Sequence, residues 1–174
     1  IVNEARDLKL VASNYHNRAY NNPKLLIYNL KNPINQLAAK IQLEGGARIE
    51  GVALIKPEQL LRIKIDKVTQ VEKGIIYTKE KGGKQGEVLV SLETYAELEN
   101  YLSLNSKFKI NRQDYYNDIK QAAIISKEVS EGSHGLRWNF AKRRMFEYGK
   151  ADYTYSDSLQ QVSYEMKHNR ASIT

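Results

Sequence analysis

The stretch Gly132–Ala141 reads G-S-H-G-L-R-W-N-F-A, and it predicts the first turns of a helix that can hold an anion. Ser133 suits the N-cap position, because its hydroxyl can accept a hydrogen bond from a free backbone N–H of the next turn. His134 and Arg137 lie three residues apart, so their side chains leave the same helix face. A helix N-terminus favours an anion, arginine can bind two phosphate oxygens at once, and histidine exchanges protons near neutral pH. The alternatives are therefore a phosphoryl-transfer site and a surface helix with an incidental histidine and arginine.

The composition is that of a basic chain without cysteine, long enough for one domain with a substantial core. The 174 residues include 27 Lys and Arg against 20 Asp and Glu, which gives a formal net charge of +7 at pH 7. This excess favours an anionic partner, nucleic acid first. The absence of Cys excludes a disulfide framework and a thiolate metal site. The sequence has neither an apolar run of membrane-spanning length nor the pattern of a signal peptide. Since its first residue is not Met, we expect it to be a piece of a longer protein.

Apolar residues at helical spacing predict three helices in the first third of the chain, over Pro23–Asn32, Ile34–Leu43 and Ile49–Ile55. The second of these ends at Gly46, because glycine suits a left-handed C-cap, and Arg48 follows closely. Residues 1–20 have only a loose helical pattern. We expect them to form a linker or the tail of a preceding DNA-binding domain, and residues 21–174 to form the main domain.

Past residue 60 the apolar period changes from helical to the alternation of half-buried strands. Three strands are predicted, over Leu61–Asp66, Gly74–Thr78 and Glu87–Ser91. The second and third are joined by K-E-K-G-G-K-Q-G, a glycine-rich stretch that predicts the turn of a β-hairpin. Lys79, Lys81 and Lys84 lie at or beside its tip, where they are either solvated or placed to contact a DNA backbone phosphate.

The rest of the chain is predicted to be helical apart from its connections. Ser91 and Asn111 suit the N-caps of two helices. The helix of the opening motif is followed by the polar stretch Tyr148–Asp157, which is predicted to be a loop, and a last helix starts at Ser156 or Asp157. The expected fold is therefore α+β and mainly α-helical, with one small three-stranded antiparallel sheet and no βαβ alternation.

Four short motifs carry a resemblance to a known family. Gly46-Ala-Arg48 follows a helix and is similar to T-G-L-R, and Thr78-Lys79 places a lysine in the hairpin between the second and third strands. Residues 133–141 are similar to H-x-L-R-H-T-F-A, and residues 159–168 to L-Q-x-V-S-x-x-L-G-H. In this order, and on these elements, the motifs resemble those of the catalytic domain of tyrosine recombinases, the integrase family of DNA breaking and rejoining enzymes. The resemblance runs from about residue 20 to the end and implies the fold of that domain.

The resemblance also implies a set of catalytic residues, namely Arg48, Lys79, His134, Arg137 and His168. The two arginines would clamp the non-bridging oxygens of a DNA phosphate and stabilise the transition state. A tyrosine would attack the phosphorus to form a 3′-phosphotyrosyl link. The lysine would protonate the leaving 5′-oxygen, and His134 would act as general base. His168 would hydrogen-bond the scissile phosphate, and no metal ion or cofactor is required.

The sequence departs from the family pattern at several positions. The acidic residue that the family has three positions after the first arginine is Gly51 here, and the acid stands at Glu50. The family's L-G-H is M-K-H at residues 166–168, and Trp138 replaces the histidine that commonly follows the second arginine. The stretch Tyr148–Asp157 looks like an insertion.

Further basic residues extend the expected contact with DNA. The hairpin tip is long, so Lys81 is an alternative to Lys79 for the catalytic role. Lys81, Lys84, Lys142 and Arg143 are expected to bind DNA. The family implies double-stranded DNA as the partner, a homo-tetramer on paired DNA sites, no membrane association, and a cytoplasmic, nucleoid-associated protein encoded by a bacterium or a phage.

Three functions stay open at the level of the sequence. The first is a site-specific recombinase or integrase of a mobile element, truncated here before its nucleophilic tyrosine, which the family's T-x-x-Y places beyond Thr174. The second is a related nicking-closing enzyme, such as a type IB topoisomerase or a telomere resolvase, that uses the same residues without strand exchange. The third is a non-catalytic DNA-binding module that keeps only the phosphate clamp.

Overall fold

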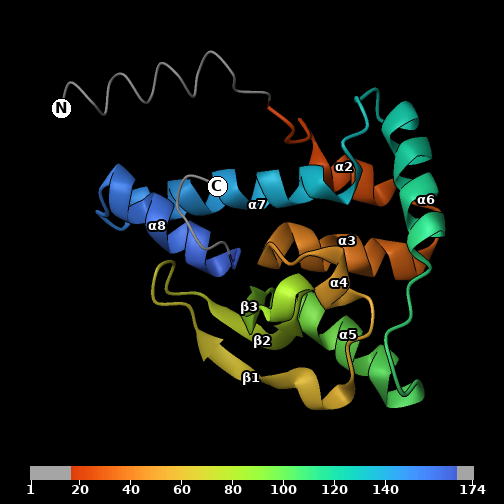
Figure 1. The fold of residues 1–174 in the computed structure, drawn as a ribbon, viewed down its shortest axis with the longest axis horizontal. Coiled ribbons are helices and arrows are strands. Elements are labelled where there is room, and N and C mark those ends of the chain that lie inside the picture. The colour runs from red at the N-terminus through yellow and green to blue at the C-terminus, as the bar shows by residue number, and fades with distance from the viewer. Residues whose placement is uncertain (1–16, 168–174) are drawn as a thin grey trace.

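The computed structural model of the protein describes residues 17–167, in which helices pack on a small sheet (Figure 1). The helices are α2 (Pro23–Tyr28), α3 (Pro33–Gly45), α4 (Ile49–Val52), α5 (Leu92–Leu104), α6 (Arg112–Ile125), α7 (Gly132–Lys150) and α8 (Tyr155–Glu165), with 3₁₀ turns η1 (Pro57–Gln59) and η2 (Lys81–Gly83). The strands are β1 (Leu60–Ile65), β2 (Glu72–Lys79) and β3 (Gln85–Val90). The expected mainly helical α+β fold with one three-stranded antiparallel sheet is confirmed. No helix in this range combines the length and apolarity that crossing a membrane needs.

The central helix is α3, which packs against α7 on one side and β3 on the other (Figure 1). Its start follows the sequence signals: the side chain of Asn32 accepts a hydrogen bond from the Ile34 N–H at 3.0 Å, and Pro33 fills the first helical position. Its end is Gly46, whose φ of 71° is the left-handed C-cap conformation. Its buried residues join the main core, among them Leu37, Ala38 and Ile41.

The helix after Arg48 is shorter than predicted. α4 is a single turn that ends at Val52 instead of continuing to Ile55. The chain then turns to pair with a distant segment, because the carbonyl of Ile55 accepts a hydrogen bond from the Phe108 N–H at 2.8 Å. Since Phe108 is fully buried in the main core, this tertiary contact ends the helix before Pro57 can do so.

The sheet has the order β1-β2-β3, and all its pairs are antiparallel. β2 and β3 form the predicted hairpin, in which Lys79, the last residue of β2, pairs with Gln85. The tip is closed by the backbone N–H of Glu80, which donates to the carbonyl of Lys84 at 2.6 Å. Gly82 adopts a φ of 77° and turns the chain between them.

The prediction of a loop over Tyr148–Asp157 is wrong, because α7 and α8 together cover most of this stretch. The hydroxyl of Thr154 accepts the N-cap hydrogen bond of α8, ahead of the predicted start at Ser156. Tyr148 is buried and donates its hydroxyl to the carboxylate of Glu165 at 2.9 Å. This contact holds the end of α7 against α8, so only a short turn separates the two helices.

The start of α7 does not use Ser133 as its N-cap, contrary to the prediction. The helix begins at Gly132, Glu131 occupies the N-cap position, and no side chain makes the capping hydrogen bond. Tyr20 covers this helix end instead, since its hydroxyl donates to the Gly132 carbonyl at 2.8 Å and accepts from the Glu131 N–H at 3.0 Å. Gly135 permits the contact, because a Cβ there would lie 2.6 Å from the Tyr20 ring.

Residues 17–20, predicted to belong to a linker, pack on α7. The side chain of Asn139 accepts from the Tyr20 N–H at 2.9 Å and donates to the Tyr20 carbonyl at 2.8 Å. Arg18 forms an ion pair with Glu131 at 2.9 Å. The end of the predicted linker is thus part of the domain. Residues 1–16 lie outside the described part of the chain, and their assignment to a linker or a preceding domain stays a prediction.

Candidate active site

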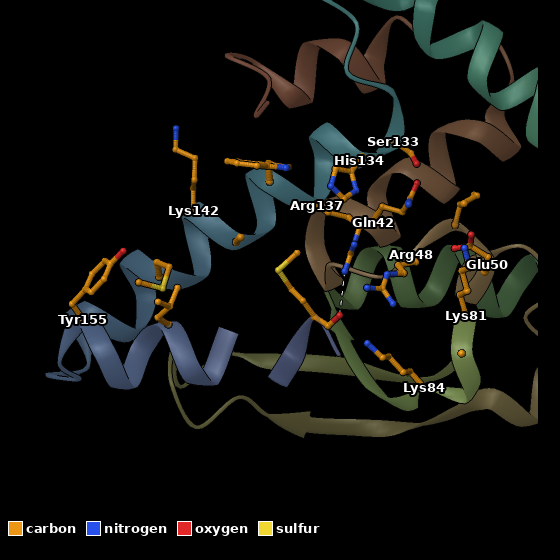
Figure 2. Close-up of a pocket in the computed structure, with 17 residues that line it drawn as sticks. Gln42, Arg48, Glu50, Lys81, Lys84, Ser133, His134, Arg137, Lys142 and Tyr155 are labelled. Atoms are coloured by element: carbon orange, nitrogen blue, oxygen red, sulfur yellow. Dashed lines mark hydrogen bonds between the residues drawn. The ribbon is translucent and has the colours of Figure 1, made fainter. Parts of the chain in front are cut away.

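A pocket of about 1000 Å³ opens along α7 from Ser133 to Met145, and α4, the hairpin tip η2 and α8 complete it (Figure 2). One acidic side chain, Glu50, lines it, against six basic ones: Arg48, Lys81, Lys84, His134, Arg137 and Lys142. The surplus of positive charge favours an anion. Within residues 17–167, no three His, Asp or Glu side chains are grouped so that they could hold a metal ion.

Arg137 lies at the inner side of the pocket, with 2% of its surface exposed. Its Nε donates to the carbonyl of Gly46 at 2.8 Å, and its Nη2 donates to the carbonyl of Met166 at 3.1 Å, the bond drawn as a dashed line in Figure 2. These carbonyls come from the ends of α3 and α8 and fix the plane of the guanidinium group. Burial and then the charge of Arg48 lower the pKa of Arg137 to about 10, so the group stays protonated at neutral pH.

Two features of the structure favour glycine at position 46. Its positive φ favours glycine, and a Cβ at this position would overlap the ring of Phe140 on α7. Its carbonyl is also the acceptor for Arg137. The glycine that precedes Ala47 and Arg48 therefore ends α3, packs against α7 and orients the second arginine of the site.

Arg48 reaches the same pocket from a different element. It is half-buried at the N-cap position of α4, and its backbone N–H donates to Oε1 of Glu80 at 3.1 Å. Figure 2 shows its guanidinium group turned toward that of Arg137, with the side chain of Lys84 directed toward both from the hairpin. Two guanidinium groups that are distant in the sequence thus face one space.

His134 lies on the open side of the pocket, one helical turn before Arg137. Partial burial, and then the charges of Arg137, Arg18 and Arg48, lower the pKa of His134. Because the pKa falls below its ordinary value of 6.5, the imidazole is mainly neutral at pH 7. A neutral imidazole at this position can accept a proton from a group bound in the pocket.

The hairpin brings two of its three lysines to the pocket. Lys81 and Lys84 line it, and Lys79 does not. Side chains alternate between the two faces of a strand, and here Thr78 and Glu80 are buried while Lys79 between them is exposed. The structure therefore brings the alternative residue Lys81, together with Lys84, to the pocket that holds the arginines, and turns Lys79 away from it.

The two basic residues expected to contact DNA from α7 differ in their surroundings. Lys142 is exposed and lines the pocket. The guanidinium group of Arg143 donates to the carbonyls of Leu43 and Glu44 at 3.1 and 2.8 Å, and its Nε lies 3.3 Å from the carboxylate of Glu147. Arg143 thus binds the last carbonyls of α3, and this structural role accounts for its position without any DNA.

Two charged residues beside the pocket escaped the sequence reasoning. The side chains of Glu80 and Lys167 are both buried, and the Lys167 Nζ lies 3.8 Å from Oε1 of Glu80. The sequence departs from the family pattern at Gly51 and at M-K-H, but these departures alone did not indicate that the two side chains meet. His168, the next residue, lies outside the described part of the chain, so its role stays a prediction.

Comparison with known proteins finds this fold in DNA recombinases. No protein-family model matches the chain, and no curated protein matches its sequence. Among solved structures, a XerH site-specific recombinase in a pre-cleavage complex with its difH substrate matches with a TM-score of 0.63 and 17% identity, over 90% of this chain and 48% of that one. A lambda integrase dimer bound to a COC′ core site matches with a TM-score of 0.64 and 13% identity, over 89% of this chain and 46% of that one.

The likeness to these two structures concerns the fold. The chain spans about half the length of each of them. Both are tyrosine recombinases, and the match extends over nearly all the elements described above. This chain therefore has the fold of a tyrosine recombinase catalytic domain.

Proposed function

We propose that this chain is the catalytic domain of a site-specific DNA recombinase or integrase, which cleaves and rejoins DNA through a 3′-phosphotyrosyl intermediate. The observation that carries the proposal is the convergence of Arg48 and Arg137 on one pocket, with His134 and two hairpin lysines beside them. The fold supports it, since the recombinases of similar structure were solved with DNA bound. The partner would be double-stranded DNA, and the active assembly a homo-tetramer on paired sites.

The arginine pair would act on a single DNA phosphate. Attack at phosphorus increases the negative charge on the non-bridging oxygens, and Arg48 and Arg137 would stabilise that charge. Since Arg137 is already oriented by two backbone carbonyls, little reorganisation is needed when the charge develops.

Two proton transfers accompany the cleavage step. As the tyrosine oxygen forms its bond to phosphorus, its proton passes to the neutral imidazole of His134. As the bond from phosphorus to the 5′-oxygen breaks, that oxygen takes a proton from a lysine ammonium group. Lys81 and Lys84 line the pocket, so we assign the proton donor to one of them in preference to Lys79. The attacking tyrosine would follow Thr174 in the full-length protein, and the reverse steps would rejoin the strand.

Covalent trapping tests the proposal. DNA duplexes that bind the full-length protein are first selected from a random library. Each selected duplex is then nicked close to the bound site and mixed with the protein. Cleavage next to the nick releases a short fragment that diffuses away, so the strand cannot be rejoined. We expect a protein–DNA link that survives detergent and heat, joined to a tyrosine as identified by mass spectrometry. DNA binding without such a link would indicate a non-catalytic module, and a link without exchange between paired sites would indicate a nicking-closing enzyme.

A further inference from the structure

A buried carboxylate lies directly behind the candidate phosphate site. The side chain of Glu80 has an exposed fraction of 0%, and its Oε1 accepts a hydrogen bond from the Arg48 N–H at 3.1 Å and from the Thr78 hydroxyl at 3.4 Å. Its Oε2 has no hydrogen-bond partner within the described residues. Burying a carboxylate is strongly unfavourable unless a cation compensates it, so the position of Glu80 depends on a nearby positive charge.

Gly51 provides the space in which this carboxylate lies. A Cβ at residue 51 would stand 2.8 Å from Cγ of Glu80 and 3.2 Å from Cβ of Thr78. Helix α4 and the end of β2 therefore approach each other through a glycine. Any side chain at this position would force Glu80 away from the backbone of Arg48.

Lys167 supplies the compensating charge from the end of α8. Its side chain is 7% exposed, and its Nζ lies 3.8 Å from Oε1 of Glu80. The residue has a φ of 59°, a conformation that is uncommon for residues other than glycine, and this turns the side chain into the protein after α8 ends. On the hairpin, the lysine passes beside Gly86, where a Cβ would lie 3.4 Å from Cε of Lys167, an ordinary contact distance.

Glu80 is the counter-charge for more than one cation. Burial lowers the pKa of Lys167, the charge of Glu80 raises it, and the charges of Arg137 and Arg48 lower it again. Burial and Arg48 likewise lower the pKa of Arg137, and Glu80 acts against them. Its carboxylate thus reduces the mutual repulsion of three positive groups that are held close together.

We propose that Glu80 and Lys167 form a positioning pair, which holds the β2–β3 hairpin against the end of α8 and so brings both arginines and the hairpin lysines to one phosphate. Glu80 binds the backbone of Arg48, and Lys167 follows Met166, whose carbonyl orients Arg137. Neither member of the pair lines the pocket, so we expect each to act through the arginines and not by contact with the phosphate. The inference rests on the proposed function, because the pair positions the residues assigned to that chemistry.

The rate of covalent trapping tests the pair in the full-length protein. Lys167→Met removes the ammonium group and keeps the side-chain length, and Glu80→Gln removes the charge and keeps the shape. At saturating DNA we expect each variant to slow single-turnover trapping by about 10²-fold, the size of effect that a small misplacement of reacting groups produces. DNA affinity should stay near that of the wild type. The double variant should be no slower than the slower single variant, because the two residues act as a unit.

Two further variants serve as controls. Lys167→Arg keeps the positive charge and should recover most of the rate. Lys64→Met removes another ion pair of the same sheet, since Lys64 Nζ lies 3.0 Å from the carboxylate of Glu87, but both partners are exposed. This variant should trap DNA at the wild-type rate.

Amide hydrogen exchange measures the same pair without catalysis. In Lys167→Met, the N–H groups of Arg48 and Glu80 should exchange faster than in the wild type, because the first donates to the Glu80 carboxylate and the second closes the hairpin. In Lys64→Met both should exchange at the wild-type rate. This measurement applies to the chain as it stands and does not need the nucleophilic tyrosine.

Three results would overturn the positioning pair. The first is a wild-type trapping rate in Lys167→Met. The second is a double variant whose loss of rate equals the product of the two single losses. The third is weaker DNA binding by Lys167→Met with an unchanged trapping rate per bound complex, which would make Lys167 a DNA contact. If the wild-type protein forms no covalent complex, the proposed function fails by itself. The amide hydrogen exchange of Arg48 and Glu80 then still tests the positioning pair. Unchanged exchange of these two N–H groups in Lys167→Met would overturn it.

Discussion

Arg137 and Arg144 lie two turns apart on α7, and both are buried, yet their surroundings are opposite in kind. The guanidinium group of Arg144 donates to the carboxylates of Asp66, Glu165 and Glu147 at 2.7, 2.9 and 2.9 Å. Arg137 donates to two backbone carbonyls and stands beside other basic groups. The charge of Arg144 is thus balanced by carboxylates, whereas the positive charge around Arg137 is not balanced.

The pKa values of the two groups follow this difference. Burial acts to lower the pKa of Arg144, but its hydrogen bonds to Glu165 and Asp66 and the charge of Glu165 raise that pKa above its ordinary value. Burial and the charge of Arg48 lower the pKa of Arg137. The charge of Arg144 is therefore neutralised by carboxylates of the protein, whereas the charge of Arg137 is available to bind an external anion. The distribution of carboxylates thus distinguishes Arg144, whose charge is balanced within the protein, from Arg137, which we propose acts on a phosphate.

Removing the structural arginine should have the largest effect, and on stability alone. Arg144→Met leaves three carboxylates without their shared cation, so we expect the free energy of unfolding to fall by about 3–5 kcal/mol. The trapping rate per folded molecule should be unchanged. Denaturant unfolding measures the loss, and Arg143→Met is the matched control. Since Arg143 is partly exposed, its loss should be about 1 kcal/mol. Equal losses in the two variants would contradict the contrast.

Removing Arg137 should act on the rate of covalent trapping. Arg137→Ala should slow covalent trapping by about 10²–10³-fold, because a preorganised donor to the transition state is lost. DNA binding should be mostly retained, since the other basic groups remain. Single-turnover trapping and fluorescence anisotropy measure the two quantities separately. Lost binding with normal trapping per bound complex would show that Arg137 is only a DNA contact.

The proton donor of the hairpin should be sensitive to the leaving group. Alanine in place of the donating lysine, Lys81 or Lys84, should slow trapping by about 10²-fold on ordinary DNA. A substrate with a 5′-thio leaving group needs little protonation and should restore the rate. Lys79→Ala should trap both substrates at the wild-type rate. Rescue of Lys79→Ala alone would mean that the hairpin rearranges before it acts.

The pH dependence of trapping should show the smallest effect, through His134. Its lowered pKa keeps the imidazole neutral at pH 7 and above, and the base is lost only when the pH falls through that lowered pKa. We therefore expect a constant rate near pH 7 and a decline toward about tenfold per pH unit in acid. His134→Gln should be slower and lack this decline. An equal decline in the variant would assign it to another group.

Local signals predicted the secondary structure well. Ser91 and Asn111 cap their helices as expected, because a cap involves only a side chain and the next few N–H groups. The prediction for Ser133 failed because Tyr20, far away in the sequence, covers that helix end. A tertiary contact of this kind leaves no local pattern.

The candidate site was predictable where short motifs carry it. Arg48 and Arg137 could be selected because each lies in a motif of a few residues. Lys79 could not be separated from Lys81, because the choice depends on which strand face the side chain leaves. The pair of Glu80 and Lys167 could not be predicted at all, since it depends on the three-dimensional gap beside α4.

A scan of uncharged methylphosphonate linkages, placed one at a time through a bound duplex, tests most directly whether Arg48 and Arg137 hold one phosphate. Each of Arg48→Ala and Arg137→Ala should bind the unmodified duplex slightly less tightly than the wild type. We expect this difference in affinity to vanish for both variants at the same linkage, because both guanidinium groups lose their shared partner there. Differences that vanish at two separate linkages, or at none, would contradict a shared phosphate and with it the proposed function.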